Sequence, residues 1–382
     1  MRTFSQHAHS VLLVGPAAGV RTAAYNAGMG GYVRNMQVYL DHFRPKEFHL
    51  LPCYNTVREK GEIPGLTLAI RFWRDIRNFF KQAREADIVH ILAQYRRAFP
   101  REAMMSSISK FLRRPFIYDI KAGEFARWYG SSPYLLRKAC SLVIRRAAAV
   151  LCEGRSMKTF VEETFNRAAI YVPNYVPEAE IPQETPGLFR DDILRVVYVG
   201  YCYRGKGVFH LLDAVDQCAK RGLPIMLTLG GQEHPEFTAY ADNKLNANPG
   251  LKVQRLGLLE HDKALACISE NDVFCLASAH PGEGHSNVLN EAMMLGRVIV
   301  ATQHGFLGEI LDESCAYFVE KHSVDSLVSA FRHICFDRNE AREKAAAARQ
   351  RLLSNFTSKQ VFPVIEACYR AALGQTPCGT CH

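Results

Sequence analysis

The stretch DVFCLASAHPGEGHSNVLNEAMMLGRVIVAT, residues 272–302, decides how this chain folds. Apolar runs over 273–278 and 298–301 predict two buried strands. Between them, a loop with two glycines leads into a helix predicted over about 286–295, which ends where Gly296 suits a left-handed backbone. This order of strand, loop, helix and strand is typical of a parallel α/β sheet, which binds ligands at its carboxyl edge.

Two glutamates flank the start of this helix, Glu283 in the loop and Glu291 within the helix. Backbone N–H groups at a helix start suit a phosphate or diphosphate, and carboxylates beside such a site can accept hydrogen bonds from the hydroxyls of a nucleotide sugar. The alternative is that both acids are solvated charges, but their occurrence together with the glycines and both strands favours a binding site. The helix-start residues are Gly284, His285, Ser286, Asn287 and Val288.

The segment EGHSNVLNEAMMLGRVIVAT, residues 283–302, resembles the E-x7-E signature of retaining GT-B glycosyltransferases of family 4, the group 1 glycosyltransferases. The resemblance implies an α/β protein of two doubly wound, Rossmann-like domains that face each other across a cleft holding the donor. It also implies that Glu283 contacts the donor sugar and Glu291 the nucleotide ribose.

A second motif opens the later domain, where LRVVYVG over 194–200 predicts a strand and YCYRGKG follows from Tyr201. The family pattern here is G-R-L-x-x-x-K-G, which places Gly200 and Lys206 in register and Tyr201 where the family has arginine. The resemblance implies that Lys206 holds the donor diphosphate. We hypothesise that Arg204 supplies the missing positive charge, and the alternative is that Lys206 is an exposed loop lysine.

The first half of the chain carries weaker signals. A strand over 10–15 is followed by a glycine-rich loop, and the resemblance places Gly30 and Gly31 against the donor phosphates and the acceptor, unless they only form a tight turn. At Lys121 the family's donor-sugar histidine is missing. The lysine itself is a positional candidate for a sugar or acceptor contact, with a solvated loop as the alternative. His90, in a strand predicted over 87–92, is expected to pack inside the sheet.

The length of 382 residues suits two domains. We expect an acceptor-binding domain over 1–177, a linker over 178–192 with prolines and clustered acids, and a nucleotide-sugar domain over 193–355. A closing helix over about 356–374 is expected to pack back on the first domain, as the resemblance implies.

Charge is unevenly distributed along the chain. Residues 1–180 hold 27 Lys and Arg against 15 Asp and Glu, hence +12, and the remainder holds 20 against 23, hence −3, which sum to +9. A basic half implies an anionic partner, and the Arg-, Phe- and Trp-bearing helix predicted over 66–84 suits an anionic membrane surface. The alternative is a solvated basic face. Nucleic acid is not expected, because no nucleic-acid motif accompanies the charge.

Several classes are excluded by pattern. No run of eighteen apolar residues occurs and the N-terminus lacks a signal-peptide pattern, so we expect a cytoplasmic protein, peripheral on the inner face of the cell membrane. The 12 cysteines lack a repeating spacing, which indicates reduced thiols. The terminal CGTCH matches a haem-attachment spacing by letter, but without an export signal a ragged tail or opportunistic zinc binding is expected.

We therefore predict a retaining glycosyltransferase that moves a sugar from a nucleotide diphosphate sugar to a saccharide or lipid-linked acceptor of cell-surface polysaccharide or lipopolysaccharide synthesis. No cofactor is expected, since Lys206, Arg204 and the helix-start amides would stabilise the leaving diphosphate in place of a metal. The alternatives are a sugar-nucleotide epimerase on the same architecture and a non-catalytic partner protein, the latter suggested by Tyr201 and the missing histidine.

Overall fold

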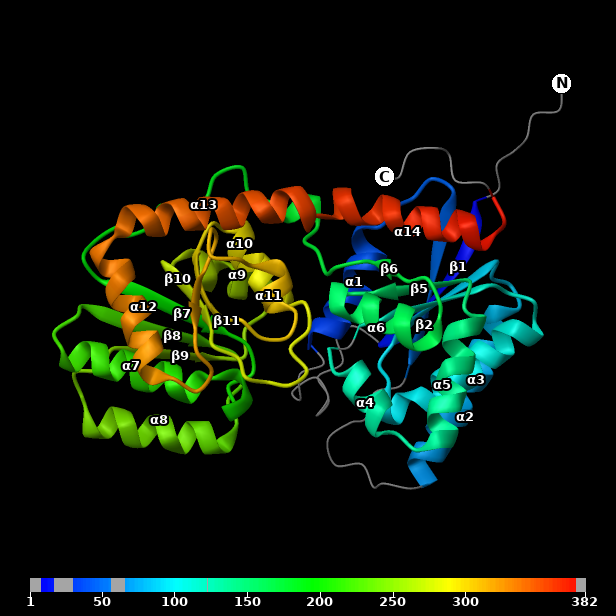
Figure 1. Cartoon of the computed structure of the whole chain (residues 1–382), viewed down its shortest axis with the longest axis horizontal. Coiled ribbons are helices and arrows are strands. Elements are labelled where there is room, and N and C mark those ends of the chain that lie inside the picture. Colours follow the sequence, from blue (N-terminus) through cyan, green and yellow to red (C-terminus); the bar gives the residue numbers. More distant parts are fainter. Residues whose placement is uncertain (1–7, 17–29, 56–65, 122, 376–382) are drawn as a thin grey trace. The chain divides into compact units, whose positions relative to one another are not determined.

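The computed structural model describes residues 8–16, 30–55, 66–121 and 123–375 (Figure 1). It divides into two compact units, residues 1–173 with 358–382 and residues 174–357. Each unit has its own parallel sheet covered by helices on both faces, which confirms the predicted class of two Rossmann-like α/β units. The loop that precedes Gly30 and the terminal CGTCH lie outside the described residues.

The first unit is built on strands in the order β2-β1-β3-β4-β5-β6. The order reverses between β1 and β3, the kind of switch point beside which open α/β sheets bind ligands. As expected, His90 is buried in β3, whose other residues are all apolar. The strands are β1 (His9–Pro16), β2 (Phe48–Asn55), β3 (Ile88–Ala93), β4 (Phe116–Ile120), β5 (Ala149–Cys152) and β6 (Ile170–Tyr171).

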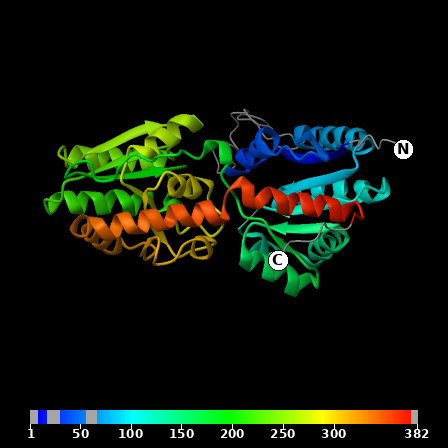
Figure 2. The same cartoon turned by 90° about the horizontal axis from the view of Figure 1, so that it is seen from above.

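Helices cover both faces of this first sheet. On one face, Tyr369 of the last helix, α14, packs against Phe43 of α1 and hydrogen-bonds His90 (2.7 Å). In both views α14 lies along the first unit although it closes the chain (Figures 1 and 2). On the other face α3 packs between α2 and α5. The helices are α1 (Gly30–His42), α2 (Leu66–Ala83), α3 (Phe99–Phe111), α4 (Phe125–Ser131), α5 (Tyr134–Arg146), α6 (Arg155–Phe165) and α14 (Ser358–Ala372).

The second unit has strands in the order β12-β11-β10-β7-β8-β9, all parallel. Here the order reverses between β7 and β10. The strands are β7 (Leu194–Val199), β8 (Ile225–Gly230), β9 (Val253–Gly257), β10 (Val273–Leu276), β11 (Val298–Thr302) and β12 (Tyr317–Val319). The helices are α7 (Val208–Lys220), α8 (Pro235–Ala247), α9 (His261–Ser269), α10 (Asn287–Met294), α11 (Leu307–Ile310), α12 (Val324–Phe336) and α13 (Arg338–Asn355).

The decisive stretch folds nearly as its sequence predicts. Ser286 caps α10 by accepting a hydrogen bond from the Leu289 N–H, and Gly296 has the expected left-handed φ of 66°. The first strand, however, ends at Leu276, two residues before the predicted end at Ser278. Its last residues leave the sheet because the next loop bonds elsewhere: the Ala279 N–H donates to the Gly205 oxygen (2.9 Å).

The expected linker, residues 178–192, packs along the second unit. The Phe189 N–H donates to the Asp272 carboxylate (2.6 Å), and Arg349 donates to the Pro182 oxygen (2.7 Å). Buried Arg297 donates to the Pro186 oxygen (2.5 Å). These contacts fix a segment whose composition alone predicts an extended, unstructured connection.

Two further findings concern the cysteines and the hydrophobicity of the helices. The ten cysteines of the described residues are all free thiols. No helix in the part of the chain that the structure describes combines the length and the apolar composition that a membrane span requires.

Candidate functional site

The candidate site lies at the carboxyl edge of the second sheet, where β7 and β10 end side by side. The loop after β7 continues into a short 3-10 helix, η4 (Arg204–Lys206), and is held against the loop after β10. Gly207 makes the close approach possible: it has a φ of 75°, and a Cβ there would lie 2.0 Å from the Ala277 oxygen. Gly200 lies at the start of the same loop, where its N–H donates to the Gly230 oxygen (2.8 Å).

Lys206 and Glu283 form an ion pair across these two loops. The Lys206 ammonium lies 2.9 Å and 2.8 Å from the two Glu283 carboxylate oxygens. The Ser278 hydroxyl donates to the same carboxylate. The Glu283 side chain is only 4% exposed, whereas that of Lys206 is 23% exposed. The carboxylate is therefore buried behind the ammonium, and the ammonium faces outward.

The backbone of Glu283 is held from behind by the turn after β11. Gly305 has a φ of 57°, and a Cβ at this position would lie 2.2 Å from the Glu283 oxygen. The Phe306 N–H donates to the same oxygen (3.3 Å). Three loops thus converge on Glu283, which fixes its carboxylate without help from a ligand.

The start of α10 is held by a buried polar network. Asn174 donates to the His285 oxygen (2.6 Å) and accepts from the Asn290 side chain (3.0 Å) at its own oxygen. Asn290 also hydrogen-bonds the His285 ring (3.0 Å). The segment from Gly284 to Val288 is thereby anchored on both sides. Its helix N-terminus concentrates partial positive charge, the electrostatics an anionic group requires.

Glu291 is the second carboxylate of the motif and lies in the middle of α10. It is 9% exposed, and the nearer ring nitrogen of His261, at the start of α9, lies 3.8 Å from it. The other ring nitrogen of His261 lies 3.2 Å from the Glu180 carboxylate. One imidazole therefore lies between two carboxylates and contacts both, which restricts where the Glu291 side chain can lie.

Arg204 and Tyr201 do not join the Lys206–Glu283 pair. The Arg204 guanidinium pairs with Glu236 of α8 and lies 4.4 Å from the centre of the Phe209 ring. This pairing also lowers the pKa of the Glu236 carboxyl. The Tyr201 ring lies 5.4 Å from that of Tyr203. The two cations of η4 are thus directed to different acids.

The remaining sequence candidates belong to the first unit. Gly30 and Gly31 form the first turn of α1. Lys121 is buried: its side chain is 2% exposed, and its ammonium lies 3.7 Å from Asp119 and donates to the Val172 oxygen (3.2 Å). The alternative of a solvated loop lysine is therefore wrong for its side chain, and the predicted sugar contact would need this buried group to be uncovered.

Sequence reasoning missed several residues that shape the site. Ser278 had a usable signal, because it is the polar residue at the end of a buried strand. The contacts of His261 with Glu291 and of Asn174 with Asn290 had none, because the partners are more than 25 residues apart and no pattern links them. Among the described residues, no group of three or more His, Cys, Asp or Glu side chains could hold a metal ion.

Known proteins resemble this chain in sequence and in fold. A model of the family described as Glycosyl transferases group 1 matches residues 194–337, most of the second unit. An uncharacterized glycosyltransferase of Methanocaldococcus jannaschii is 23% identical over 304 residues, covering 72% of this chain and 69% of its own. Glycogen synthase of Mycobacterium tuberculosis is 24% identical over 268 residues, covering 67% and 62%. Anabaena HepE, crystallised with UDP and glucose, shares the fold, with a TM-score of 0.65, 16% identity and coverage of 94% and 98%.

Proposed function

Since this chain is a glycosyltransferase whose group 1 domain spans residues 194–337, we propose that it transfers a sugar from a nucleotide diphosphate sugar to a hydroxyl acceptor with retention at the anomeric carbon. The observation that carries the proposal is the outward-facing Lys206 ammonium, held on buried Glu283 beside the start of α10. That arrangement offers a fixed cation and a helix N-terminus to one anionic group.

Donor binding follows from the groups at this edge. The Lys206 ammonium has three N–H donors. Two of them bind the two carboxylate oxygens of Glu283, which leaves the third for a diphosphate oxygen. The N–H groups from Gly284 to Val288 would bind the same diphosphate. Glu291, fixed by His261, would accept hydrogen bonds from the ribose, and Glu283 would accept them from the sugar. Arg204 would contribute only if a ligand drew it away from Glu236.

The reaction breaks the bond between the anomeric carbon and the diphosphate oxygen and forms one from that carbon to the acceptor oxygen. Negative charge develops on the departing diphosphate, where Lys206 and the α10 amides would stabilise it. We propose that the departing phosphate oxygen takes the acceptor proton on the same face of the sugar, which gives retention without a protein nucleophile. Because the chain supplies this positive charge itself, we propose that no metal is needed.

The acceptor is proposed to be a saccharide or lipid-linked saccharide of cell-surface polysaccharide or lipopolysaccharide synthesis. The basic first half of the chain, with +12 from 27 basic and 15 acidic residues over 1–180, supports a peripheral position on the inner face of the cell membrane. Gly30 and Gly31 remain candidates for acceptor or donor contacts from the first unit, whereas Lys121 would become one only if a ligand uncovered its buried ammonium.

A thermal-shift panel of UDP-, GDP-, ADP- and CMP-sugars tests donor binding, because a bound ligand raises apparent stability by mass action. One nucleotide class should raise the melting temperature. The matching radiolabelled sugar should then appear in an acceptor-linked product with retained configuration. Isomerised nucleotide sugar without acceptor-linked product would instead establish the epimerase, and no shift with any donor would contradict the proposal.

Glu291→Ala is the sharpest variant for the same assay. It should abolish the donor-induced shift while the melting temperature without donor stays close to that of the parent. Glu343→Ala, an exposed glutamate in α13, is the matched control and should keep the full shift. A Glu291→Ala protein that binds and turns over donor normally would remove this residue from the site.

A further inference from the structure

The outer surface of α2, α3 and α5, called here the three-helix surface, exposes an unusual number of large apolar side chains. These helices lie side by side on one face of the first sheet. Trp73 of α2 is 60% exposed, Phe111 of α3 is 79% exposed and Leu135 of α5 is 77% exposed. The full set is Ile70, Trp73, Phe80, Phe111, Tyr134, Leu135 and Leu142. Exposed apolar groups gathered on neighbouring elements mark an interaction surface.

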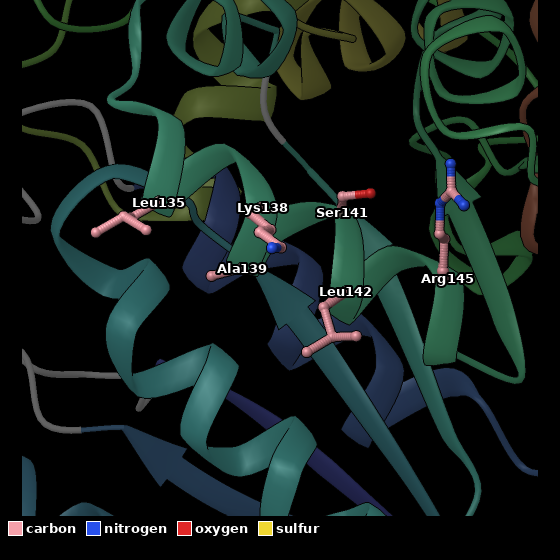
Figure 3. Close-up of a pocket in the computed structure, with 6 residues that line it drawn as sticks. All are labelled: Leu135, Lys138, Ala139, Ser141, Leu142 and Arg145. Carbon is pink, nitrogen blue, oxygen red and sulfur yellow. The ribbon is translucent and has the colours of Figure 1, made fainter.

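Helix α5 shows the arrangement most clearly. Leu135, Lys138, Leu142 and Arg145 follow one another along one side of the helix and line a shallow pocket together with Ala139 and Ser141 (Figure 3). Apolar and cationic side chains therefore alternate along a single stripe. On the opposite side of the same helix Cys140, Val143 and Ile144 are buried in the unit.

The charges of the three-helix surface have one sign. The only carboxylates within the three helices, Asp75 and Glu102, are buried: Asp75 pairs with Arg101 (2.9 Å), and Glu102 accepts a hydrogen bond from Tyr118 (2.8 Å). The cations point outward. Those classed as exposed are Arg74, Arg77, Lys81, Lys110, Arg137, Lys138, Arg145 and Arg146.

We propose that the three-helix surface docks on a bilayer that contains anionic lipid. Cations over such a surface attract anionic headgroups, and Leu and Phe side chains between them can enter the acyl boundary. Trp and Tyr are the residues enriched at this depth, which Trp73 and Tyr134 supply. The outer surface of these three helices carries cations and no carboxylate, so its charge is complementary to a uniformly anionic membrane surface. A partner of mixed charge would not require the carboxylates to be buried.

The three-helix surface would carry the membrane association that is part of the proposed function. The proposal rests on that function only for the biological reason for docking. Docking itself needs no donor and no turnover, so the two can fail separately. Glu283→Ala should eliminate transfer and leave docking unchanged. Variants of the three-helix surface should lose docking and keep transfer to a water-soluble acceptor.

The test is sedimentation of the full chain with sucrose-loaded vesicles of phosphatidylcholine, with and without phosphatidylglycerol. Binding should appear with the anionic lipid and weaken as salt rises, because salt screens exposed charges. Trp73 gives a second readout, since Trp128 is packed among Tyr95, Phe99 and Phe125. A blue shift of tryptophan fluorescence on vesicle addition should disappear in Trp73→Phe while most of the binding remains.

Two variants separate the apolar and electrostatic contributions. Leu135→Ser/Leu142→Ser should lower the partition coefficient about tenfold or more, by loss of buried apolar area. Lys138→Glu/Arg145→Glu should lower it by a similar factor, about tenfold, at low salt only. Phe336→Ser is the matched control: Phe336 is 92% exposed but belongs to α12 of the second unit, so its loss should change nothing.

Three results would overturn the proposal. The first is failure to bind anionic vesicles at low salt, and the second is binding that neither surface variant reduces. The third is a concentration-dependent dimer that Leu135→Ser/Leu142→Ser dissociates, which would show that a second copy of the chain covers this face. Circular dichroism of each variant checks that the fold is retained.

Discussion

Each unit places a lysine and a carboxylate at the carboxyl edge of its parallel sheet, yet the two pairs differ in what surrounds them. In the second unit, Lys206 is 23% exposed and binds both oxygens of Glu283. In the first, Lys121 is 2% exposed and lies 3.7 Å from Asp119, which is fully buried. The same residue types at equivalent edges therefore have unequal access to a ligand.

The surroundings of the first pair explain its burial. Asp119 also lies 3.4 Å from His90, whose other ring nitrogen hydrogen-bonds Tyr369 of α14. Lys121, Asp119, His90 and Tyr369 form one chain of polar contacts inside the first unit. The lesson is that a position at a sheet edge does not make a binding residue, because a ligand also needs an approach. Four variants, from the largest expected effect to the smallest, test this difference.

Of the four variants, Lys206→Met should have the largest effect, and this effect should be a loss of turnover. Loss of one preorganised group facing developing negative charge costs roughly 3 to 4 kcal/mol in the barrier, about a hundred- to a thousandfold in kcat. Steady-state kinetics with the donor identified by the thermal-shift panel measures this loss. Folding stability should fall less than in Lys121→Met, because Glu283 keeps its hydrogen bond from Ser278 and the removed ammonium is partly exposed.

Lys220→Met is the control for Lys206→Met, because Lys220 is 62% exposed and pairs with Asp216 of its own helix, α7. It should leave kcat unchanged. If Lys206→Met turned over donor at the parental rate, the Lys206–Glu283 pair would have only a structural role, like the Lys121–Asp119 pair. The two pairs would then not differ in function.

Lys121→Met should have the opposite effect: the free energy of unfolding should fall, while turnover should change little. Removing one partner of a buried pair leaves the other charge uncompensated, which costs about 3 kcal/mol, at the low end for buried pairs because Asp119 keeps His90 nearby. Urea unfolding measures the loss. Residual folded enzyme should keep kcat within a few-fold of the parent. A stable variant with abolished turnover would instead restore Lys121 as a ligand of the sugar.

The sequence predicted the second pair's setting well because its signals are local. The cap at Ser286, the φ of Gly296 and the helix between them follow from neighbouring residues. Glu283 and Lys206 were identified separately, each from a motif of its own. Their direct contact could not be predicted from spacing, since 77 residues separate them and it depends on how β7 and β10 pair in space.

The first pair was harder to predict because its environment comes from distant segments. Lys121 follows a short strand and lies two residues before Gly123, a pattern typical of an exposed loop. It is buried because Val172, about fifty residues later, supplies an oxygen for its ammonium. Likewise, the composition of 178–192 predicts a linker, but Asp272, Arg297 and Arg349 bind its backbone. Contacts between residues so far apart in the sequence produce no periodic pattern from which they could be predicted.

His261→Ala should have an intermediate effect, on donor binding. His261 touches no proposed ligand group but lies between Glu180 and Glu291, so it acts as a positioning residue. Without it the two carboxylates lose the imidazole that lies between them, and the Glu291 side chain gains conformational freedom. The donor dissociation constant should rise about tenfold, about 1.4 kcal/mol, with a smaller change in kcat.

Isothermal titration of His261→Ala, against His333→Ala as control, measures this effect. His333 pairs with Glu340 on the outside of the second unit, so its loss should not weaken binding. An unchanged dissociation constant would show that α10 alone fixes Glu291.

Tyr369→Phe should have the smallest effect of the four, and again on stability. The change removes one buried hydroxyl and leaves the His90 ring nitrogen without the 2.7 Å hydrogen bond it has in the parent, which costs about 1 kcal/mol. Turnover should stay at the parental level, because this end of the polar chain only holds α14 on the first unit. Tyr134→Phe, on an exposed tyrosine of α5, should be neutral in the same urea titration. If Tyr369→Phe were as stable as the parent but slower in transfer, the polar chain ending at Lys121 would have to be assigned to function after all.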